Sequence, residues 1–407
     1  MYDWGISAYP VIITTFIFAT YFTSHIAVNE IIGTHQWGNA MAISGVIIAI
    51  LSPLFGAIAD YFGKRKYWLG FFTCLMILSS AFLWFAYPDF AYVRFTLVCV
   101  IIGTIGLNIS MVFYNALLVD ITTRHYFGRI SGWGWGVGYL GGLCILVIVL
   151  FVLMNPKFNG LNDHTYRNVR MCGPLVSLWT ILFGLPLFFM VPEQKLSKKS
   201  LSQSIYLGTK ELYFTFKHML HEKNILFFLI SQMIYIDGLN TLFAFGGIYA
   251  AGTFHMQMKE VLLFGIVMNL FAGIGSIILA WVDDWIGSKR TVQWSLIALI
   301  LLGFGIVLAK TKIGFWFLAC LLSLFVGPVQ SSSRSLMTRL IPREKATEYF
   351  GFYVLSGKVS TFVGPWILGM LTFLFNSQRI GMSSILFFFI FGFVILNYVK
   401  IKPVPLK

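Results

Sequence analysis

Three ionisable side chains lie deep inside long apolar stretches: Asp237, Arg334 and Lys358. Placing such a group at the centre of a bilayer costs roughly 2.5 to 3.5 kcal/mol on insertion scales, so a chain seldom keeps one without a role in pairing, packing or transport. Asp237 shares a helical face with Asn240 and Thr241 through i, i+3 and i+4 spacing. We expect the Asp237 carboxylate to carry a coupling ion, with a proton favoured. The alternative is a fixed ion pair with Lys358 or Arg334.

Arg334 offers a planar fork of donors that suits a carboxylate or a phosphate. Gln330 lies one turn earlier on the same face, and Ser335 is adjacent. This group predicts a binding site for an anionic or zwitterionic substrate, with Lys358 as the next candidate. The alternative is an arginine that merely extends to the aqueous boundary.

Neutral polar and aromatic side chains extend the predicted substrate site. Asn108 and Asn115 lie two turns apart on one face of an apolar stretch, with Tyr114 beside them. Trp135 and Tyr139 are expected to form an aromatic wall. The alternatives are hydrogen bonds between helices for the asparagines and anchoring at the membrane interface for the rings.

The sequence has no arrangement typical of enzyme catalysis. It has no Ser/His/Asp spacing, no HExxH, no Walker-type glycine loop and no cluster of metal ligands. Its five cysteines lie in or beside apolar runs without CxxC spacing, which argues against a metal site or a disulfide framework. We therefore expect neither an enzyme nor an ATP-driven pump, with no catalytic residue, no metal and no cofactor.

The composition is that of a membrane protein. Of the 407 residues, 58% are hydrophobic and 11% charged, whereas a soluble domain carries about a quarter charged residues. The net charge of +14, from 29 basic and 15 acidic residues, would suggest a nucleic-acid partner in a soluble protein. Here the positive-inside bias and attraction to anionic lipid explain it, so we expect membrane lipids and no nucleic acid as partners.

Twelve stretches are long and apolar enough to cross a bilayer, which requires about twenty residues. They fall near residues 7–27, 37–59, 67–87, 92–118, 129–153, 171–191, 224–250, 260–282, 292–309, 314–337, 349–374 and 381–400. The first has no basic flank and no cleavage site, so we expect a retained helix and not a signal peptide.

A polar stretch separates two sets of six spans. We therefore divide the chain into an N-terminal bundle (1–191), a linker (192–223) and a C-terminal bundle (224–407). The excess of Lys and Arg in alternate loops places the linker and both termini in the cytoplasm. Leu207, Leu212, Tyr213, Phe216 and Leu220 recur at helical spacing, which predicts an amphipathic helix on the cytoplasmic leaflet.

Two similar loops follow the second and the eighth spans. The first contains Gly56, Asp60, Gly63, Arg65 and Lys66; the second contains Ala280, Asp284, Gly287, Lys289 and Arg290, all 224 positions later. Phe127-Gly128 and Phe350-Gly351 match at an offset of 223. Two pairs of matching segments, separated by nearly the same number of residues, indicate a duplicated six-helix unit.

The pattern Gly-x3-Asp-x2-Gly-x-basic-basic resembles the signature loop of the major facilitator superfamily. The resemblance implies an all-α fold of twelve transmembrane helices in two pseudo-symmetric six-helix bundles around a central chamber. It also implies that Asp60 faces the start of the eleventh helix and Asp284 the start of the fifth, where they latch the outward-open state. The predicted gating residues are Gly56, Asp60, Gly63, Arg65, Asp284, Gly287, Lys289 and Arg290.

A narrower resemblance covers most of the chain and is to the autophagy-related vacuolar effluxer branch. It rests on several segments in order: Tyr2-Asp3-Trp4, Tyr114-Asn115-Ala116 with Asp120, the glycine- and tryptophan-rich run from Gly128 to Gly142, Asp237-Gly238 with Asn240-Thr241, Gln330 to Leu336, and Phe350 to Tyr353 with Ser356-Gly357-Lys358. Fungal vacuolar members are associated with amino-acid export. The short loops here resemble a bacterial member, which implies the inner membrane.

These observations predict a secondary active transporter that works by alternating access and is coupled to an ion, with a proton favoured. The expected substrate is a small polar, zwitterionic or anionic metabolite, with an amino-acid-like molecule and export favoured. One alternative is an importer of a nutrient or of a larger amphipathic, lipid-like solute. Another is a receptor or scaffold that transports nothing. We expect a monomer.

Overall fold

The computed structural model describes residues 1–153, 165–192 and 201–400, and every regular element in these ranges is helical. Twelve segments are long and apolar enough to cross a membrane, which confirms the predicted number. The protein is therefore an all-α, integral, multi-pass membrane protein.

The first six spans form what we call the N-bundle. They are built from α1 (Tyr2–Ile6), η1 (Tyr9–Phe16), α2 (Phe18–Tyr21) and η2 (Phe22–Ile26) as one span, then α3 (Glu30–Phe62), α4 (Arg65–Phe82) with η3 (Leu83–Phe85), η4 (Phe90–Tyr92) with α5 (Val93–Ile121), η5 (Arg124–Tyr126) with α6 (Phe127–Ile148) and η6 (Val149–Leu153), and α7 (Arg167–Arg170) with α8 (Cys172–Met190).

The last six spans form the C-bundle, and α9 (Leu201–His221) lies between the two bundles in the chain. The C-bundle consists of α10 (Lys223–Phe254), α11 (Met258–Ile286), α12 (Ser288–Leu308), α13 (Lys312–Leu340), η7 (Arg343–Lys345) with α14 (Ala346–Val359) and α15 (Val363–Phe375), and α16 (Gln378–Asn397). The division of the chain at residues 191 and 224 stays a prediction.

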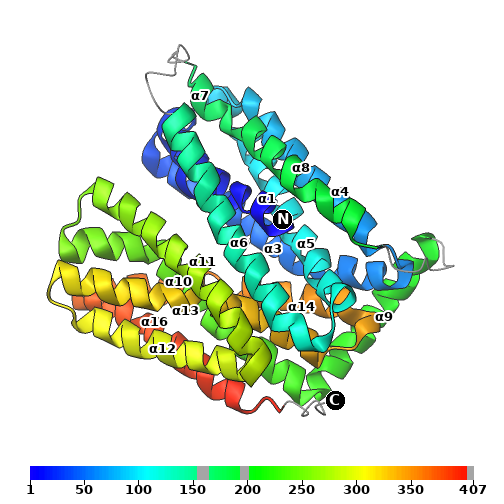
Figure 1. Cartoon of the computed structure of the whole chain (residues 1–407). Coiled ribbons are helices and arrows are strands. Elements are labelled where there is room, and N and C mark those ends of the chain that lie inside the picture. The colour runs from blue at the N-terminus through cyan, green and yellow to red at the C-terminus, as the bar shows by residue number, and fades with distance from the viewer. Residues whose placement is uncertain (154–164, 193–200, 401–407) are drawn as a thin grey trace.

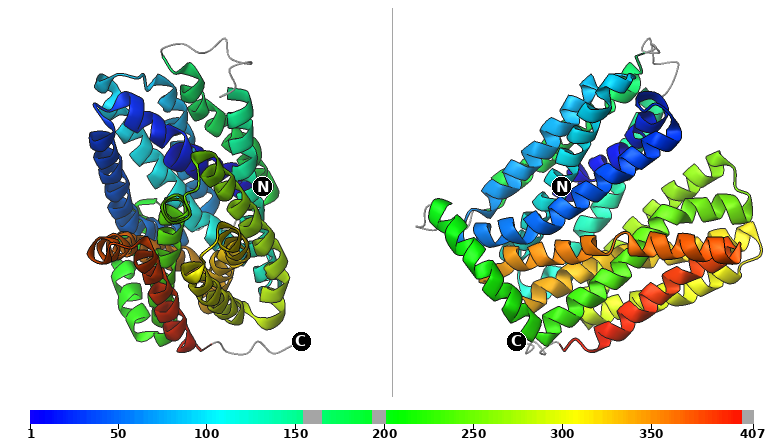
Figure 2. Two further views of the ribbon diagram at one scale, coloured as in Figure 1. Left: turned by 90° about the vertical axis from the view of Figure 1, so that its left-hand side faces the viewer. Right: turned by 180° about the vertical axis from the view of Figure 1, so that it is seen from behind.

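The two bundles approach each other at one end of the molecule and diverge toward the other (Figures 1 and 2). The end where they approach is the one that carries α9, and we call it the linker end. The opposite end, where the ribbons of the bundles spread apart, is called the open end. Most buried apolar side chains form one cluster in each bundle, and Val112, Ala116 and Val119 of α5 join the cluster of the C-bundle.

The first span begins earlier than the sequence predicts. It starts at Tyr2 and not near residue 7, and it places Asp3 in the interior with 6% of its surface exposed. The predicted start was wrong because it followed the apolar run alone, whereas Tyr114 and Arg334 of other helices accommodate Asp3 in the interior. The span then continues as η1, a π-helical stretch with Pro10 at its start, where a missing amide N–H removes no helical hydrogen bond.

The eleventh span is two helices and not one. Its first half, α14, ends at Val359, and its second half, α15, starts at Val363. Pro365 explains the break, because it lacks the N–H that would bond to the carbonyl of Thr361 in a continuous helix. The break places Lys358 at the end of one half-helix and Gly364 in the first turn of the next.

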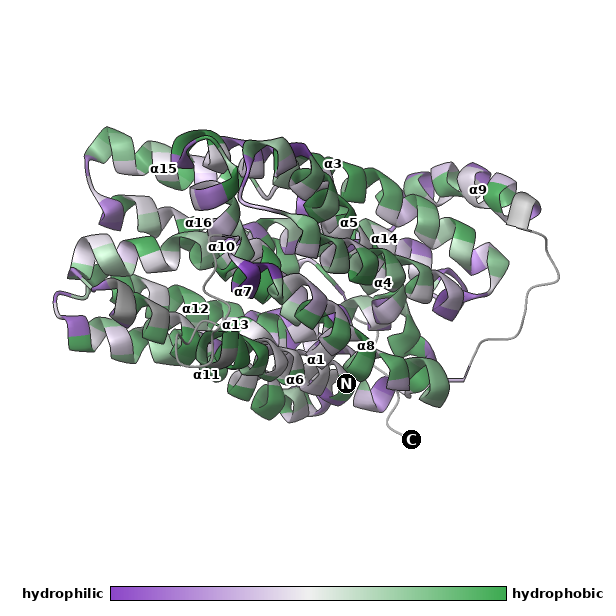
Figure 3. Ribbon diagram, turned by 90° about the horizontal axis from the view of Figure 1, so that it is seen from above, coloured by the Kyte–Doolittle hydropathy of each residue, from purple (hydrophilic) through white to green (hydrophobic). Residues whose placement is uncertain are grey.

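The predicted amphipathic linker helix corresponds to α9. The face with Ser204, Gly208, Thr215 and Met219 is buried, and α9 packs against α3. The apolar residues Tyr213, Phe216 and Leu220 are exposed at 66%, 45% and 46%. Hydrophilic and hydrophobic residues are mixed along this helix, whereas hydrophobic residues predominate along most helices of the bundles (Figure 3).

Close contact between α11 and α13 holds the C-bundle together. A Cβ atom at Gly275 would collide with the carbonyl oxygen of Leu324 on α13. At the open end, Lys312 donates a hydrogen bond to Glu260, which lies in the first turn of α11. This hydrogen bond lowers the pKa of Glu260, so the carboxylate stays ionised and the two helix starts stay paired.

We expect Gly275→Ala to destabilise the protein, because the new methyl group pushes against backbone that cannot move aside. The midpoint of thermal unfolding in detergent should fall by several degrees. Gly265→Ala is the matched control, since it lies on the same helix and a Cβ there meets no atom within 4 Å. Equal midpoints for the two variants would contradict the close approach of α11 and α13.

Candidate functional site

Glycines allow the two bundles to touch at the linker end. A Cβ atom at Gly56 on α3 would lie 2.5 Å from the carbonyl oxygen of Thr347 on α14, and one at Gly351 would lie 2.5 Å from Cα of Pro53. Both distances are shorter than real Cβ contacts. On the other side of the interface, a Cβ at Gly132 on α6 would lie 2.5 Å from Cβ of Ala280 on α11. The glycine missing from the second loop is therefore replaced by one on the facing helix.

Asp60 caps a helix of the opposite bundle. Its carboxylate accepts hydrogen bonds from the backbone N–H of Thr347 at 3.3 Å and of Glu348 at 2.8 Å, in the first turn of α14. Lys345 precedes that helix and provides no side-chain cap. Because the first N–H groups of a helix have no intrahelical acceptor, the carboxylate also complements the positive end of the helix dipole.

Arg65 holds the Asp60 carboxylate in place. Its Nη2 donates to Asp60 at 2.8 Å and to the carbonyl of Arg343 at 3.0 Å, and its Nη1 donates to Asp120 at 2.9 Å. Arg65 is 3% exposed. One guanidinium therefore joins α3 and α5 of the N-bundle to the segment that leads into α14.

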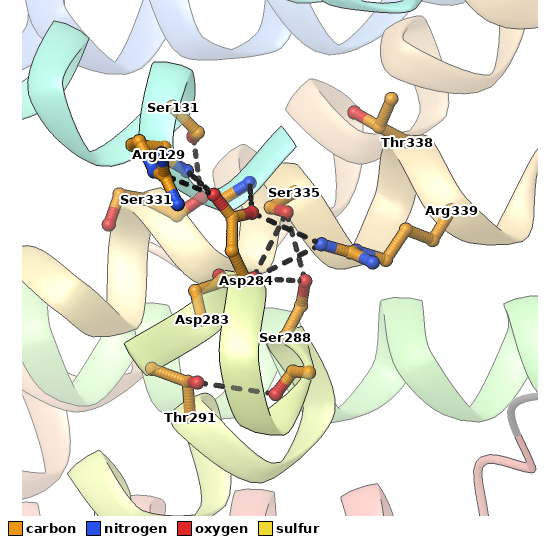
Figure 4. A network of polar contacts seen from close by, with 12 residues as sticks. Arg129, Ser131, Asp283, Asp284, Ser288, Thr291, Ser331, Ser335, Thr338 and Arg339 are labelled. Atoms are coloured by element: carbon orange, nitrogen blue, oxygen red, sulfur yellow. Dashed lines mark hydrogen bonds and ion pairs between the residues drawn. The ribbon is translucent and has the colours of Figure 1, made fainter. Parts of the chain in front are cut away.

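Asp284 repeats this arrangement in the other direction (Figure 4). Its carboxylate accepts from the backbone N–H of Gly128 at 2.8 Å and of Arg129 at 3.1 Å, in the first turn of α6. Tyr126 precedes α6 and gives it no side-chain cap. Each aspartate thus lies where the resemblance places it, at the start of a helix in the opposite bundle.

The cations around the two aspartates differ. Arg339 of α13 lies 3.6 Å from both Asp283 and Asp284, and the side chain of Arg129 lies 3.4 Å from Asp284. Lys289 and Arg290, which match the basic pair of the first loop, do not reach the carboxylate. Lys289 donates instead to the carbonyl of Asn397 at 3.1 Å.

Arg334 is buried between the bundles and does not extend to an aqueous boundary, so that alternative is wrong. It is 4% exposed, and its Nε and Nη2 donate to the hydroxyl and carbonyl oxygens of Ser131 on α6, each at 2.8 Å. Its Nη1 donates to the amide oxygen of Asn115 at 3.3 Å and lies 3.9 Å from a carboxylate oxygen of Asp3. We call Arg334, Ser131, Asn115, Asp3 and Tyr114 the central hub.

Tyr114 completes the central hub by donating to the Asp3 carboxylate at 2.5 Å, and Arg334 lies over the Tyr114 ring at 5.5 Å. Gly134 makes room for these groups, because a Cβ there would collide with Asp3. Toward the open end, Tyr139 donates to the amide oxygen of Gln330 at 3.0 Å.

Asp237 caps the second half of the broken span. One carboxylate oxygen accepts from the N–H of Gly364 at 3.0 Å, and the other is buried without a hydrogen-bond partner. Asp237 is 1% exposed. Among the described residues it forms no ion pair, so the predicted alternative of a fixed pair with Lys358 or Arg334 is wrong for this conformation.

The side chains of the remaining predicted residues make no recorded hydrogen bond to another helix in the described ranges. Lys358 and Asn240 are half-buried, and neither side chain has a recorded hydrogen bond or ion pair. The amide of Asn108 bonds within its own helix, to the carbonyl of Thr104 at 2.8 Å. The indole N–H of Trp135 is buried without a partner.

A pocket of about 330 Å³ lies between η1 and helices α10, α11 and α13. Its walls are mainly apolar, and the polar exceptions are Thr15, Tyr249, Asn269 and Ser323. The hydroxyl of Tyr249 is buried and has no hydrogen-bond partner. None of the residues predicted to bind substrate lines this pocket.

Sequence reasoning did not single out Asp3, Ser131 or Arg339 as site residues. Asp3 precedes the hydropathy-defined first span, and Ser131 is small and common. Only an earlier start for the first helix would have revealed Asp3, because it would then have counted as an ionisable residue inside the membrane.

Comparison with known proteins identifies relatives along the whole chain. The family described as "Vacuole effluxer Atg22 like" matches residues 39–403. An uncharacterized MFS-type transporter of Bacillus subtilis, YxiO, is 28% identical over 402 residues, which cover 98% of this chain and 93% of that protein. Autophagy-related protein 22 of Saccharomyces cerevisiae is 21% identical over 310 residues, which cover 67% of this chain and 57% of that protein. The chain thus spans little more than half of the fungal relative.

Solved structures show the same fold. The proton:xylose symporter XylE matches with a TM-score of 0.74 at 15% identity, over 98% of this chain and 94% of that chain. FucP, a major facilitator transporter in the outward conformation, matches with a TM-score of 0.77 at 12% identity, over 98% and 97% of the two chains. At these identities the similarity establishes the major facilitator fold.

We expect Asp60→Asn combined with Asp284→Asn to loosen the linker end, because an amide nitrogen cannot accept from the helix N–H groups. Ser331, 3% exposed at the interface, serves as the reporter through Ser331→Cys in a background without native cysteines. Its alkylation by a water-soluble maleimide should accelerate about tenfold or more, since losing one charge-assisted bond of about 1.5 kcal/mol shifts an equilibrium that far.

The Asp60→Asn/Asp284→Asn protein is called the gate variant. Its control is Glu30→Gln with Asp89→Asn, which removes two exposed carboxylates from the first and second open-end loops. This control should leave the alkylation rate unchanged. If the gate variant and the control react at the same rate, the carboxylate caps do not hold the linker end closed.

Proposed function

Because the chain belongs to the Vacuole effluxer Atg22-like family and has the major facilitator fold, we propose that it is a secondary active transporter. Its substrate in this proposal is a small polar, zwitterionic or anionic metabolite, with an amino-acid-like molecule and export favoured. The observation that carries the proposal is the central hub, which places polar and charged side chains at the meeting point of the two bundles. Members of this superfamily are generally not enzymes.

The conformation in this proposal is outward-open. The excess of Lys and Arg near the linker end supports a cytoplasmic location for that end, and we propose the same side for both termini. The caps formed by Asp60 and Asp284 then close the cytoplasmic gate. Gly56 lets α3 approach α14 closely, and Gly63 and Gly287, with φ of 71° and 92°, let the first and the second loop turn. A bacterial inner membrane is the favoured location, and a monomer the favoured state.

The substrate site in this proposal has two cations with different roles. Arg334 is already held by Asn115 and Ser131, so it is bound to the closed gate and becomes free only when the bundles separate. Lys358 is half-buried without a recorded partner in the described ranges, so it is the cation available to a carboxylate or phosphate in this state. Gln330, Tyr139, Trp135, Asn108 and Asn240 would supply neutral contacts around it.

Asp237 is the proposed coupling residue. Its ionised carboxylate interacts with the positive end of α15, and its second oxygen has no partner, so a proton can be added there without breaking an existing bond. Protonation removes the negative charge of Asp237 and so weakens its attraction to α15, which is the outer half of the eleventh span. A proton that crosses with the membrane potential releases about 2.3 kcal/mol per 100 mV.

The second candidate function is transport of a larger amphipathic or lipid-like solute, including nutrient import. The apolar pocket between η1, α10, α11 and α13 favours it, because it offers about 330 Å³ without a charged side chain on its walls. A receptor or scaffold that moves nothing is the third possibility, and failure of every ligand to cross a membrane would support it.

Lys358→Gln should weaken binding of an anionic or zwitterionic ligand about tenfold or more, since a charge-assisted hydrogen bond is lost. A thermal-shift screen of the purified protein with amino acids, peptides, sugars and organic anions identifies the ligand, and its affinity is then compared between variants. Lys310→Gln, an exposed lysine at the open end, is the control. Equal affinities for the wild type and Lys358→Gln would remove Lys358 from the site.

Asp237→Asn should abolish uptake driven by a pH gradient while sparing exchange of labelled substrate across proteoliposomes. The amide oxygen can still accept from Gly364, so the variant keeps the helix cap and loses only the titratable group. Glu30→Gln should change neither activity. Gradient-driven accumulation at the wild-type rate would show that another group couples the ion.

A further inference from the structure

A second and larger pocket, of about 1070 Å³, lies at the linker end, where Asp284 and Arg339 of the gate form part of its wall. It is formed where the first turns of α10 and α12 meet the last turns of α13 and α16. The segment before α6 adds Arg124 from the other bundle. The pocket therefore spans the boundary between the two bundles.

The walls of this pocket are strongly basic. Five cations, Arg124, Lys289, Arg290, Arg339 and Lys400, line it, against two acids, Glu222 and Asp284. Among the described residues, only Arg339 of these cations forms an ion pair, at 3.6 Å from the Asp284 carboxylate and from its neighbour Asp283. Glu222 lies 3.6 Å from His218, a contact that is an ion pair only when the histidine is protonated. The positive charge of the pocket is thus largely uncompensated.

The helix that carries two of these cations makes the field more positive. Lys289 and Arg290 lie in the first turn of α12, which has no side-chain cap. Cations there add to the positive end of the helix dipole, an unfavourable arrangement unless an anion is bound. In the first repeat, by contrast, Arg65 is neutralised by Asp60 and Asp120. In the second repeat, Lys289 and Arg290 form no ion pair with any of the described residues, although Glu222 and Asp284 line the same pocket.

Aromatic side chains place the pocket at the level of the membrane interface. Trp285 is part of its wall and is 87% exposed, and Tyr398, beside the lining residues Asn397 and Val399, is 63% exposed. Exposed Trp and Tyr at the ends of transmembrane helices typically lie among lipid headgroups. A basic pocket between helices at this depth is suited to the phosphate of a lipid.

We propose that this pocket binds the headgroup of an anionic phospholipid from the cytoplasmic leaflet, with Lys289 and Arg290 as the main phosphate ligands. Arg124 reaches the same headgroup from the N-bundle. The bound lipid bridges the two bundles beside the Asp284 cap and stabilises the closed linker end. This inference requires the orientation given under the proposed function but neither its substrate nor its coupling ion.

The test uses the full-length protein, freed of lipid in detergent and examined by native mass spectrometry with added phosphatidylglycerol, cardiolipin or phosphatidylcholine. We expect the two anionic lipids to bind at least about tenfold more tightly than phosphatidylcholine. Lys289→Gln with Arg290→Gln should reduce that preference about tenfold or more, because each basic side chain near the surface contributes on the order of 1 kcal/mol. Arg124→Gln should reduce it less.

The matched control is Arg94→Gln with Lys310→Gln, which removes two exposed cations from open-end segments of the two bundles. It should retain the preference for anionic lipid, and gel filtration confirms that each variant is folded. Equal loss in the control and the test variant, or equal binding of all three lipids to the wild type, would overturn the proposal. Stabilisation by inorganic phosphate or a nucleoside diphosphate without any lipid preference would also overturn it, in favour of a soluble anion.

Discussion

The closed end of this molecule depends on two helices that cannot cap themselves. The starts of α6 and α14 follow Tyr126 and Lys345, neither of which provides a side-chain acceptor. Each helix receives its acceptor from the opposite bundle, as Asp284 or Asp60. Because unpaired N–H groups at a buried helix end are costly, the requirement for a cap becomes an attraction between the bundles. This attraction can also be reversed: when the bundles separate, water can satisfy both the carboxylates and the N–H groups, so the net free energy of closure stays small compared with the sum of the bonds.

The central hub applies the same principle to a buried arginine. Arg334 uses three of its nitrogens on oxygens of Ser131 and Asn115, both from the N-bundle, although the residue itself belongs to α13. Its nearest anion, Asp3, is shared with Tyr114 and lies 3.9 Å away. A guanidinium so placed is neutralised only while the bundles touch. A substrate carboxylate that reaches it as they part would replace partners that the movement removes, which links ligand binding to the change of state in physical terms.

The sequence was sufficient for the architecture because the bilayer imposes simple rules. A span needs a long apolar run, so hydropathy located all twelve spans, and the repeated loop identified Asp60 and Asp284.

The sequence did not reveal the partners that side chains acquire only when the two bundles pack against each other. Arg339 lies 55 positions after Asp284 and belongs to no local motif, yet it takes the place that Arg65 has in the first repeat. Asp3 was overlooked because its burial depends on Gly134, a residue from another helix whose missing side chain leaves the space. Hydropathy also treats α14 and α15 as one span, although Pro365 signals the break that gives Asp237 its partner.

The two repeats hold their gate aspartates, Asp60 and Asp284, with basic residues placed in different ways. In the first, the basic residue Arg65 is 3% exposed and joined to two acids and a carbonyl, so that loop is rigid. In the second, Arg129 and Arg339 are longer-range partners of Asp284, and the local basic pair faces outward into the large pocket. On both sides of the interface an aspartate accepts two backbone N–H bonds from the opposite bundle, and Arg129 adds an ion pair at 3.4 Å on the α6–α11 side. Both sides also have glycines on each of the two facing helices: α3 meets α14 through Gly56 and Gly351, and α6 meets α11 through Gly136 and Gly273. Backbone therefore lies close to backbone on both sides of the closed end, and the linker helix α9 adds its packing on the α3 side alone.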